Sequence, residues 1–121
     1  MAGTDILNAS AVYPQVIVSQ QLSASDSSVY TAPASTSIKI AQGTMCNVTN
    51  ATVYINLSLL KTGQSIDATH RVIHNYPLAG GDTLSLRDYL VGAMLGPGDM
   101  IAAFASAASS VDIVISGTVH Q

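Results

Sequence analysis

Two histidines and a nearby aspartate are the first residues of this 121-residue chain that could do chemistry. His70 and His74 are four positions apart, and Asp67 lies just before them. On a helix this spacing would place both imidazoles on one face, as in zinc sites. We expect a strand instead, in which residues four apart are separated by about 13 Å. The segment also lacks the glutamate of the catalytic motif, so we predict exposed edge-strand histidines and no metal.

Two aspartates follow a glycine within a turn, an arrangement that also occurs in calcium loops. Asp82 and Asp99 are the residues concerned. A calcium site needs several converging oxygens, and the chain has no D-x-D-x-D run. We therefore interpret both as turn-forming aspartates that accept hydrogen bonds from their own backbone.

Nucleophilic and acid–base catalysis find little support in the sequence. There is no G-x-S-x-G elbow around any serine, and the neighbours of Cys46 would not activate its thiol. All seven acidic residues are aspartate, and nothing singles out a glycosidase pair. The glycines from Gly92 to Gly98 lack the lysine of a phosphate loop. We predict a protein that is not an enzyme, with no catalytic, cofactor-binding or metal-binding residues and no cofactor.

Asparagine and tyrosine offer two further kinds of site, both related to sugars. The N-x-S/T pattern occurs by chance in a chain this rich in Ser and Thr, at Asn8, Asn47, Asn50 and Asn56. A stacking platform would need exposed aromatic rings, and the tyrosines are Tyr13, Tyr30, Tyr54, Tyr76 and Tyr89. The best candidate is Tyr54 with Asn56 and Ser58, although tyrosines on strand faces and at subunit contacts are the interpretation we favour.

The composition indicates a subunit of an assembly. Only 9% of the residues are charged and 48% are hydrophobic, so much of the surface is neutral. The net charge is −3 and the basic residues are scattered, at Lys39, Lys61, Arg71 and Arg87, which argues against nucleic acid as a partner. Gly96 to Asp99 interrupts the most apolar stretch, and the first residues lack signal-peptide features, so we expect neither a membrane span nor secretion.

Alternation of apolar and polar residues predicts short strands along most of the chain. The clearest runs from Val53 to Leu59, with Tyr54, Asn56 and Ser58 on its outer face. The inward residues of two earlier strands are expected to be Val16, Val18 and Leu22, then Ile38, Ile40, Cys46 and Val48. Further strands are expected at 29–31, at 69–74 on an edge, at 84–86, at 101–105 in a central position and at 111–116, with one helical turn within 87–94.

About eight short strands separated by turn signals predict a single all-β domain. We expect an antiparallel β-sandwich of jelly-roll or Greek-key type over residues 15–121. Residues 1–14 lack periodicity and end at Pro14, so we expect an N-terminal arm that lies on a neighbour or extends freely.

Several short motifs occur in an order that resembles small β-sandwich virion proteins of tailed bacteriophages. They are a YTAP turn at 30–33, a CNVT strand end at 46–49, a leucine pair at Leu84 and Leu86, a hairpin LGPGDMI at 95–101 and a closing Ser116-Gly117. The resemblance covers residues 14–118 and departs from the pattern in the polar, histidine-bearing segment from Gly63 to Asn75, where we expect this protein to meet its own partner.

The resemblance implies a structural component of the virion and carries over no catalytic residue. It favours an oligomeric capsid decoration protein, with a trimer as the expected oligomer and the major capsid protein or other virion proteins as partners. It implies a location in the virion after assembly in the cytoplasm of the bacterial host. The alternatives are a minor tail, baseplate or fibre component and, from a different class, a carbohydrate- or receptor-binding module.

Overall fold

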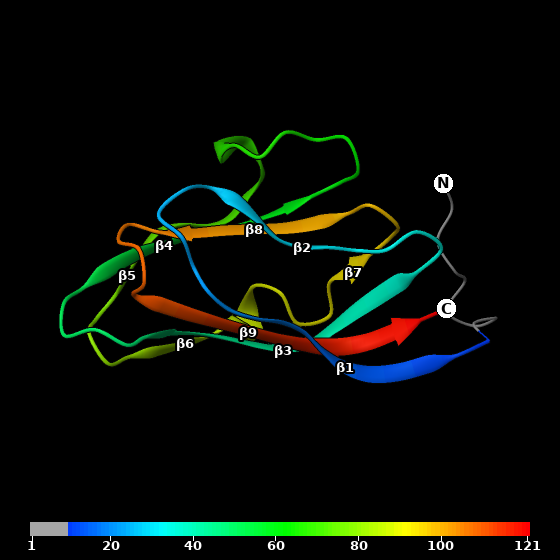
Figure 1. Cartoon of the computed structure of the whole chain (residues 1–121), viewed down its shortest axis with the longest axis horizontal. Coiled ribbons are helices and arrows are strands. Elements are labelled where there is room, and N and C mark those ends of the chain that lie inside the picture. Colours follow the sequence, from blue (N-terminus) through cyan, green and yellow to red (C-terminus); the bar gives the residue numbers. More distant parts are fainter. Residues whose placement is uncertain (1–9) are drawn as a thin grey trace.

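A computed structural model describes residues 10–121 of the protein, which form two antiparallel sheets packed face to face (Figure 1). The first sheet has the order β1 (Val12–Gln21), β9 (Val111–His120), β3 (Ser37–Asn47) and β6 (Thr83–Ser85), and β7 (Met94–Leu95) also pairs with β3. The second has the order β2 (Ser27–Thr31), β8 (Met100–Ala105), β4 (Val53–Leu60) and β5 (Arg71–Leu78). Within residues 10–121, two 3-10 helices lie in the connections, η2 (Ala68–His70) and η3 (Leu86–Asp88).

The strand order is that of a jelly roll. Because β6 and β7 both pair with β3, at 44–46 and at 38–39, they share one position of the first sheet. The chain then crosses between the sheets at almost every connection, which gives eight positions in two sheets of four. The predicted antiparallel all-β sandwich is confirmed, with nine strands where about eight were expected.

The core lies between the sheets and is formed by one apolar face of each strand. In β9 the residues Val111, Ile113 and Ile115 are fully buried, and in β4 so are Ile55 and Leu57. This alternation follows the predicted pattern, because successive side chains of a strand point to opposite faces. The predicted central strand at 101–105 is also confirmed, since β8 lies between β2 and β4.

A bulge in β3 reverses the predicted orientation of its second half. The pairing of β3 with β9 shifts register between Ile40 and Gln42. Beyond that point Met45 is fully buried, whereas Val48 is 54% exposed and Cys46 is partly exposed. The prediction that Cys46 and Val48 point inward is wrong, because one extra residue moves every later side chain to the opposite face.

A second bulge has the same effect in β1. The register against β9 shifts between Val16 and Val18, and Val16 is 57% exposed while Val18 is 3% exposed. The prediction that Val16 points inward is therefore wrong. The strand also begins at Val12, so part of the expected arm is paired with β9, and residues 1–9 of that arm lie outside the described residues.

The segment around the two histidines is divided between a helix and a strand. The strand predicted from residue 69 begins only at Arg71, because residues 68–70 form η2 with Asp67 as its N-cap. The predicted edge position is confirmed, since β5 ends the second sheet. The strand continues to Leu78 and includes Pro77, because an edge position tolerates the missing N–H of a proline.

The helical turn predicted within 87–94 is shorter and begins earlier than expected. It consists of η3 and a hydrogen bond of 2.8 Å from the Leu90 amide to the Leu86 carbonyl. Leu86 and Leu90 are buried, but Met94 belongs to β7 and is 53% exposed. Within residues 10–121, no helix has the length and apolar character that crossing a membrane requires.

Candidate functional site

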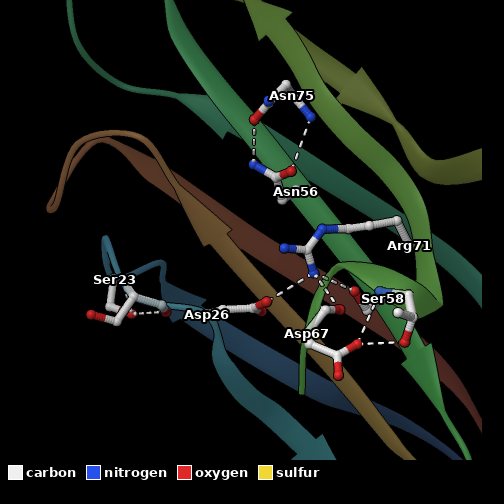
Figure 2. Close-up of polar contacts among 9 residues, drawn as sticks. Ser23, Asp26, Asn56, Ser58, Asp67, Arg71 and Asn75 are labelled. Atoms are coloured by element: carbon white, nitrogen blue, oxygen red, sulfur yellow. Dashed lines mark hydrogen bonds and ion pairs between the residues drawn. The ribbon is translucent and has the colours of Figure 1, made fainter. Parts of the chain in front are cut away.

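The densest polar cluster lies on the outer face of the second sheet and is centred on Arg71. Arg71 is the first residue of edge strand β5, and Figure 2 shows its guanidinium directed toward Asp26, with Ser58 and Asp67 beside it. Its Nη1 lies 2.8 Å from the Asp26 carboxylate and donates to the Ser58 hydroxyl at 2.7 Å and the Asp67 carbonyl at 3.1 Å. Its Cζ lies 5.2 Å from the centroid of the Phe104 ring, a cation–π contact.

The partners of Arg71 come from two other strands of that sheet and from the residue before a third. Ser58 belongs to β4 and Phe104 to β8, while Asp26 directly precedes β2. The ion pair therefore links edge strand β5 to the connection that leads into the opposite edge strand, β2. The side chains of Arg71 and Asp26 are 12% and 21% exposed, and Ser58 is fully buried although it faces outward from the core.

The loop that carries Asp26 is held in place by Ser23. The Ser23 hydroxyl donates to the Ser25 carbonyl at 2.8 Å, and the Ser23 carbonyl accepts from the Ala105 amide at 3.0 Å. These bonds tie the connection between β1 and β2 to the end of β8. These hydrogen bonds thus hold the Asp26 carboxylate in position beside Arg71. We interpret the Arg71 cluster as a set of contacts that holds the strands of the second sheet together on its outer face.

A pair of asparagines braces the same sheet further along β5. The Asn56 side chain donates to Asn75 Oδ1 at 3.1 Å and accepts from the Asn75 amide at 3.0 Å (Figure 2). Asn75 has a φ of 48°, a left-handed conformation that asparagine tolerates better than most residues. The pair stabilises the irregular register of β5 against β4, and Asn56 is buried as a result, with 1% exposure.

The three residues of the predicted sugar platform do not form an exposed surface. Tyr54 is 44% exposed, but Asn56 and Ser58 are buried, with Asn56 hydrogen-bonded to Asn75 and Ser58 to Arg71. The burial of Asn56 and Ser58 therefore counts against the sugar platform, which was the less favoured interpretation of these residues. Elsewhere, Tyr13 donates to the Gln121 side chain at 3.0 Å, Tyr76 is 38% exposed, Tyr89 packs against the core, and partial burial raises the pKa of Tyr30.

The residues considered for a metal site do not converge. The Asp67 carboxylate accepts from the Thr69 amide at 2.9 Å and from the Thr69 hydroxyl, while His70 ends η2 and His74 is exposed on β5. Over residues 10–121 there is no group of three His, Cys, Asp or Glu side chains that could hold an ion. Asp67 acts here as the cap of a 3-10 helix.

We expect acid to weaken this cap. The hydrogen bonds from the Thr69 hydroxyl and amide, with smaller contributions from His70 and Arg71, hold the pKa of Asp67 below its usual value. A carboxyl whose pKa is lower in the folded state adds stability above its unfolded pKa, near 4, and this is lost as the pH falls through the folded value. NMR titration should show the lowered pKa, and Thr69→Val should move it back toward normal. An unchanged pKa in that variant would contradict the assignment.

The turn aspartates and the buried asparagine have structural partners. Asp99 accepts from the Gly96 amide at 2.9 Å and the Thr62 amide at 3.0 Å, which joins the turn before β8 to the loop after β4. The Asp82 carbonyl accepts from the Asn47 amide at 2.9 Å. The buried Asn47 side chain donates to the carbonyls of Ala51 and Leu78 at 2.8 and 2.9 Å. Asn50 is exposed, and Asn8 lies outside the described residues.

The outer face of the first sheet is a second candidate, which we call the β9 face. Cross-strand pairing arranges its side chains in rows over β1, β9 and β3: Pro14, Thr118 and Lys39; Val16, Ser116 and Gln42; Ser19, Val114 and Thr44; Gln21, Asp112 and Cys46. The two middle rows contain no charge, and all of their residues except Ser19 line a hollow of about 110 Å³ together with Gly43. Sequence reasoning missed this face because it placed Val16 in the core.

Comparison with known proteins gives a likeness of fold. The sequence matches no protein-family model and no curated protein. A similar solved structure is a chain in the structure of infectious bursal disease virus, Gx strain, with a TM-score of 0.51 and 14% identity. The match covers 91% of this chain and 32% of the viral chain, so the protein spans about a third of the length of that neighbour. Identity this low establishes a common fold alone.

Proposed function

We propose that this protein is a non-enzymatic structural component of a virus particle. The observation that carries the proposal is the jelly-roll strand order, which is a common architecture of viral capsid proteins. It is supported by a likeness of fold, over 91% of this chain, to a chain of a virus structure. The low charge of the chain and the uncharged middle of the β9 face suit a subunit that is packed against others.

The finer proposal is an oligomeric capsid decoration protein of a tailed bacteriophage. It is supported by the motifs of the resemblance, two of which contact each other in the fold. The Ala32 amide of the YTAP turn donates to the Asp99 carbonyl at 2.8 Å, and the Gly98 amide donates to the Ala32 carbonyl at 2.9 Å. Gly117 of the closing motif lies against the β3 backbone at Lys39. Two of the shared motifs are therefore hydrogen-bonded to each other, as expected if they specify one fold.

Purified particles provide the test of the virion role. We expect mass spectrometry of the virus that encodes this chain to find it in intact particles, and separated heads to retain it while tails lack it. The heads of particles from a deletion mutant should break open more readily on heating or on dilution of salt than those of the wild type. Restoring the gene is the control. Absence of the chain from washed particles would refute the virion role, and its presence in tails alone would replace decoration by a tail function.

A further inference from the structure

One edge of the first sheet is long, uncharged and unpaired. β1 has ten residues, VYPQVIVSQQ, without a charged side chain, and Val12 to Val16 are all exposed. Among residues 10–121 only β9 pairs with it. A strand at the edge of a sheet presents a row of free backbone N–H and C=O groups, which is a template for another strand.

The free groups can be assigned from the ladder between β1 and β9. Ala11 and Gln121 exchange both backbone hydrogen bonds, at 3.0 and 2.8 Å, and Leu22 donates to the Val111 carbonyl at 2.8 Å. In an antiparallel pair every second residue bonds to its neighbour, so the intervening residues point their backbone groups away from it. These outward residues are Val12, Pro14 and Val16 before the bulge, and Ser19 and Gln21 after it. Pro14 thus occupies a position where β9 needs no N–H.

The other three edges are protected in ways that β1 is not. β2 has five residues, and the edge opposite β1 is divided between β6 and β7, with three and two residues. β5 is longer, but it carries Arg71, His74 and Pro77 and is distorted by the left-handed Asn75. Short length, charge, proline and local distortion are the devices that keep sheet edges from pairing. Apart from Pro14 and a single bulge, β1 lacks them.

We propose that the β1 edge pairs antiparallel with β1 of a second copy of this chain, forming one continuous sheet across a two-fold axis. An antiparallel pair of identical strands is self-complementary, as a two-fold contact requires. Each copy carries a net charge of −3, yet β1 itself adds none to the contact. The nearest carboxylate, that of Asp112, lies on β9, one strand inward from the edge. In the paired sheet the two β9 strands would be about 14 Å apart, so the repulsion between their Asp112 carboxylates would be largely screened.

The contact is a dimer interface, whereas the trimer expected from the sequence would need a different surface. The proposed pairing of β1 edges does not rest on the proposed role in the virus particle. A chain that dimerises in solution but is absent from particles would overturn only that role. A monomer found in particles would overturn only the pairing.

Light scattering and amide exchange test the pairing directly. We expect the molar mass to rise with concentration to twice the chain mass of 12.4 kDa. The amides of Val16, Ser19 and Gln21 should exchange at least about tenfold more slowly in the dimer than in the monomer, because they become hydrogen-bonded. The amide of Gln20, which bonds to β9, should be protected at all concentrations. A single-chain mass at every concentration, or a dimer with these three amides unprotected, would overturn the proposal.

Two lysine variants distinguish edge pairing from contact through the β9 face. Val16 is 57% exposed on the edge strand, and Val114 is 40% exposed on the central strand β9. Val16→Lys should weaken dimerisation at least about tenfold, because it introduces like charges at the paired edge. Val114→Lys should leave it nearly unchanged, and circular dichroism should show both variants folded. Equal weakening of dimerisation by both variants would assign the contact to the β9 face. If a variant does not fold, amide exchange in the unmodified chain distinguishes the two contacts.

Discussion

Gly117→Ala is expected to destabilise the protein by about 3 kcal/mol or more, and to prevent folding if the native stability is modest. Gly117 lies in β9 opposite Ile40 of β3, beside the bulge in that strand. A Cβ atom built on Gly117 would lie 2.2 Å from the Lys39 carbonyl oxygen and 3.1 Å from its carbon. These are backbone atoms, so no side-chain rotation can relieve the clash, and the two strands would have to separate.

Denaturant unfolding followed by circular dichroism measures this effect, and Gly96→Ala is the matched control. At Gly96 the nearest heavy atom to a built Cβ is Asp99 Oδ2 at 3.5 Å, an ordinary contact, and its φ is not positive. That variant should change the free energy of unfolding by less than about 1 kcal/mol. If both alanine variants were equally stable, the close approach of β9 and β3 at Gly117 would be contradicted.

Arg71→Ala is expected to lower the free energy of unfolding by about 2–4 kcal/mol, somewhat less than for a fully buried ion pair. The substitution leaves the Asp26 carboxylate, whose side chain is 21% exposed, without its cation. It also removes a hydrogen bond to the buried Ser58 and the contact with the Phe104 ring. An unpaired carboxylate in a partly desolvated site accounts for most of the expected loss.

Arg87→Ala is the control for removing a positive charge, because Arg87 is exposed and its backbone, not its guanidinium, makes the hydrogen bond at Ser85. Its effect should be within about 0.5 kcal/mol. A double-mutant cycle with Asp26→Ala should yield a coupling energy of about 1–3 kcal/mol. Independent effects of the two substitutions, or a loss no larger than that of Arg87→Ala, would show that Arg71 does not hold the sheet together.

The strands themselves could be predicted because alternation is a local property of the chain. Val53 to Leu59 and Val111 to Ser116 lie within β4 and β9 as expected, and Val53, Ile55 and Leu57 of the first and Val111, Ile113 and Ile115 of the second are in the core. The bulges in β1 and β3 could not be predicted, since a bulge is defined by the register against a partner strand. The errors at Val16, Cys46 and Val48 all lie at or beyond such a point.

The Arg71 cluster could not be predicted for a related reason. The sequence places Arg71 among scattered basic residues, Asp26 in a turn and Ser58 on an outward face. Only the strand order β2, β8, β4, β5 brings these three residues within reach of one another. These residues are buried by side chains of segments that are distant in the sequence. The alternation of apolar and polar residues within a single strand cannot predict such burial.

By itself the sequence determined that this is an all-β protein of short strands and low charge, because residue type, alternation and turn signals act between near neighbours in the chain. The tertiary structure decided what becomes of the candidate residues. It separated His70 from His74 between a helix and a strand, and it placed Asp67 in a cap. It also left β1 as a free edge, since strand order is determined by packing two sheets around one core.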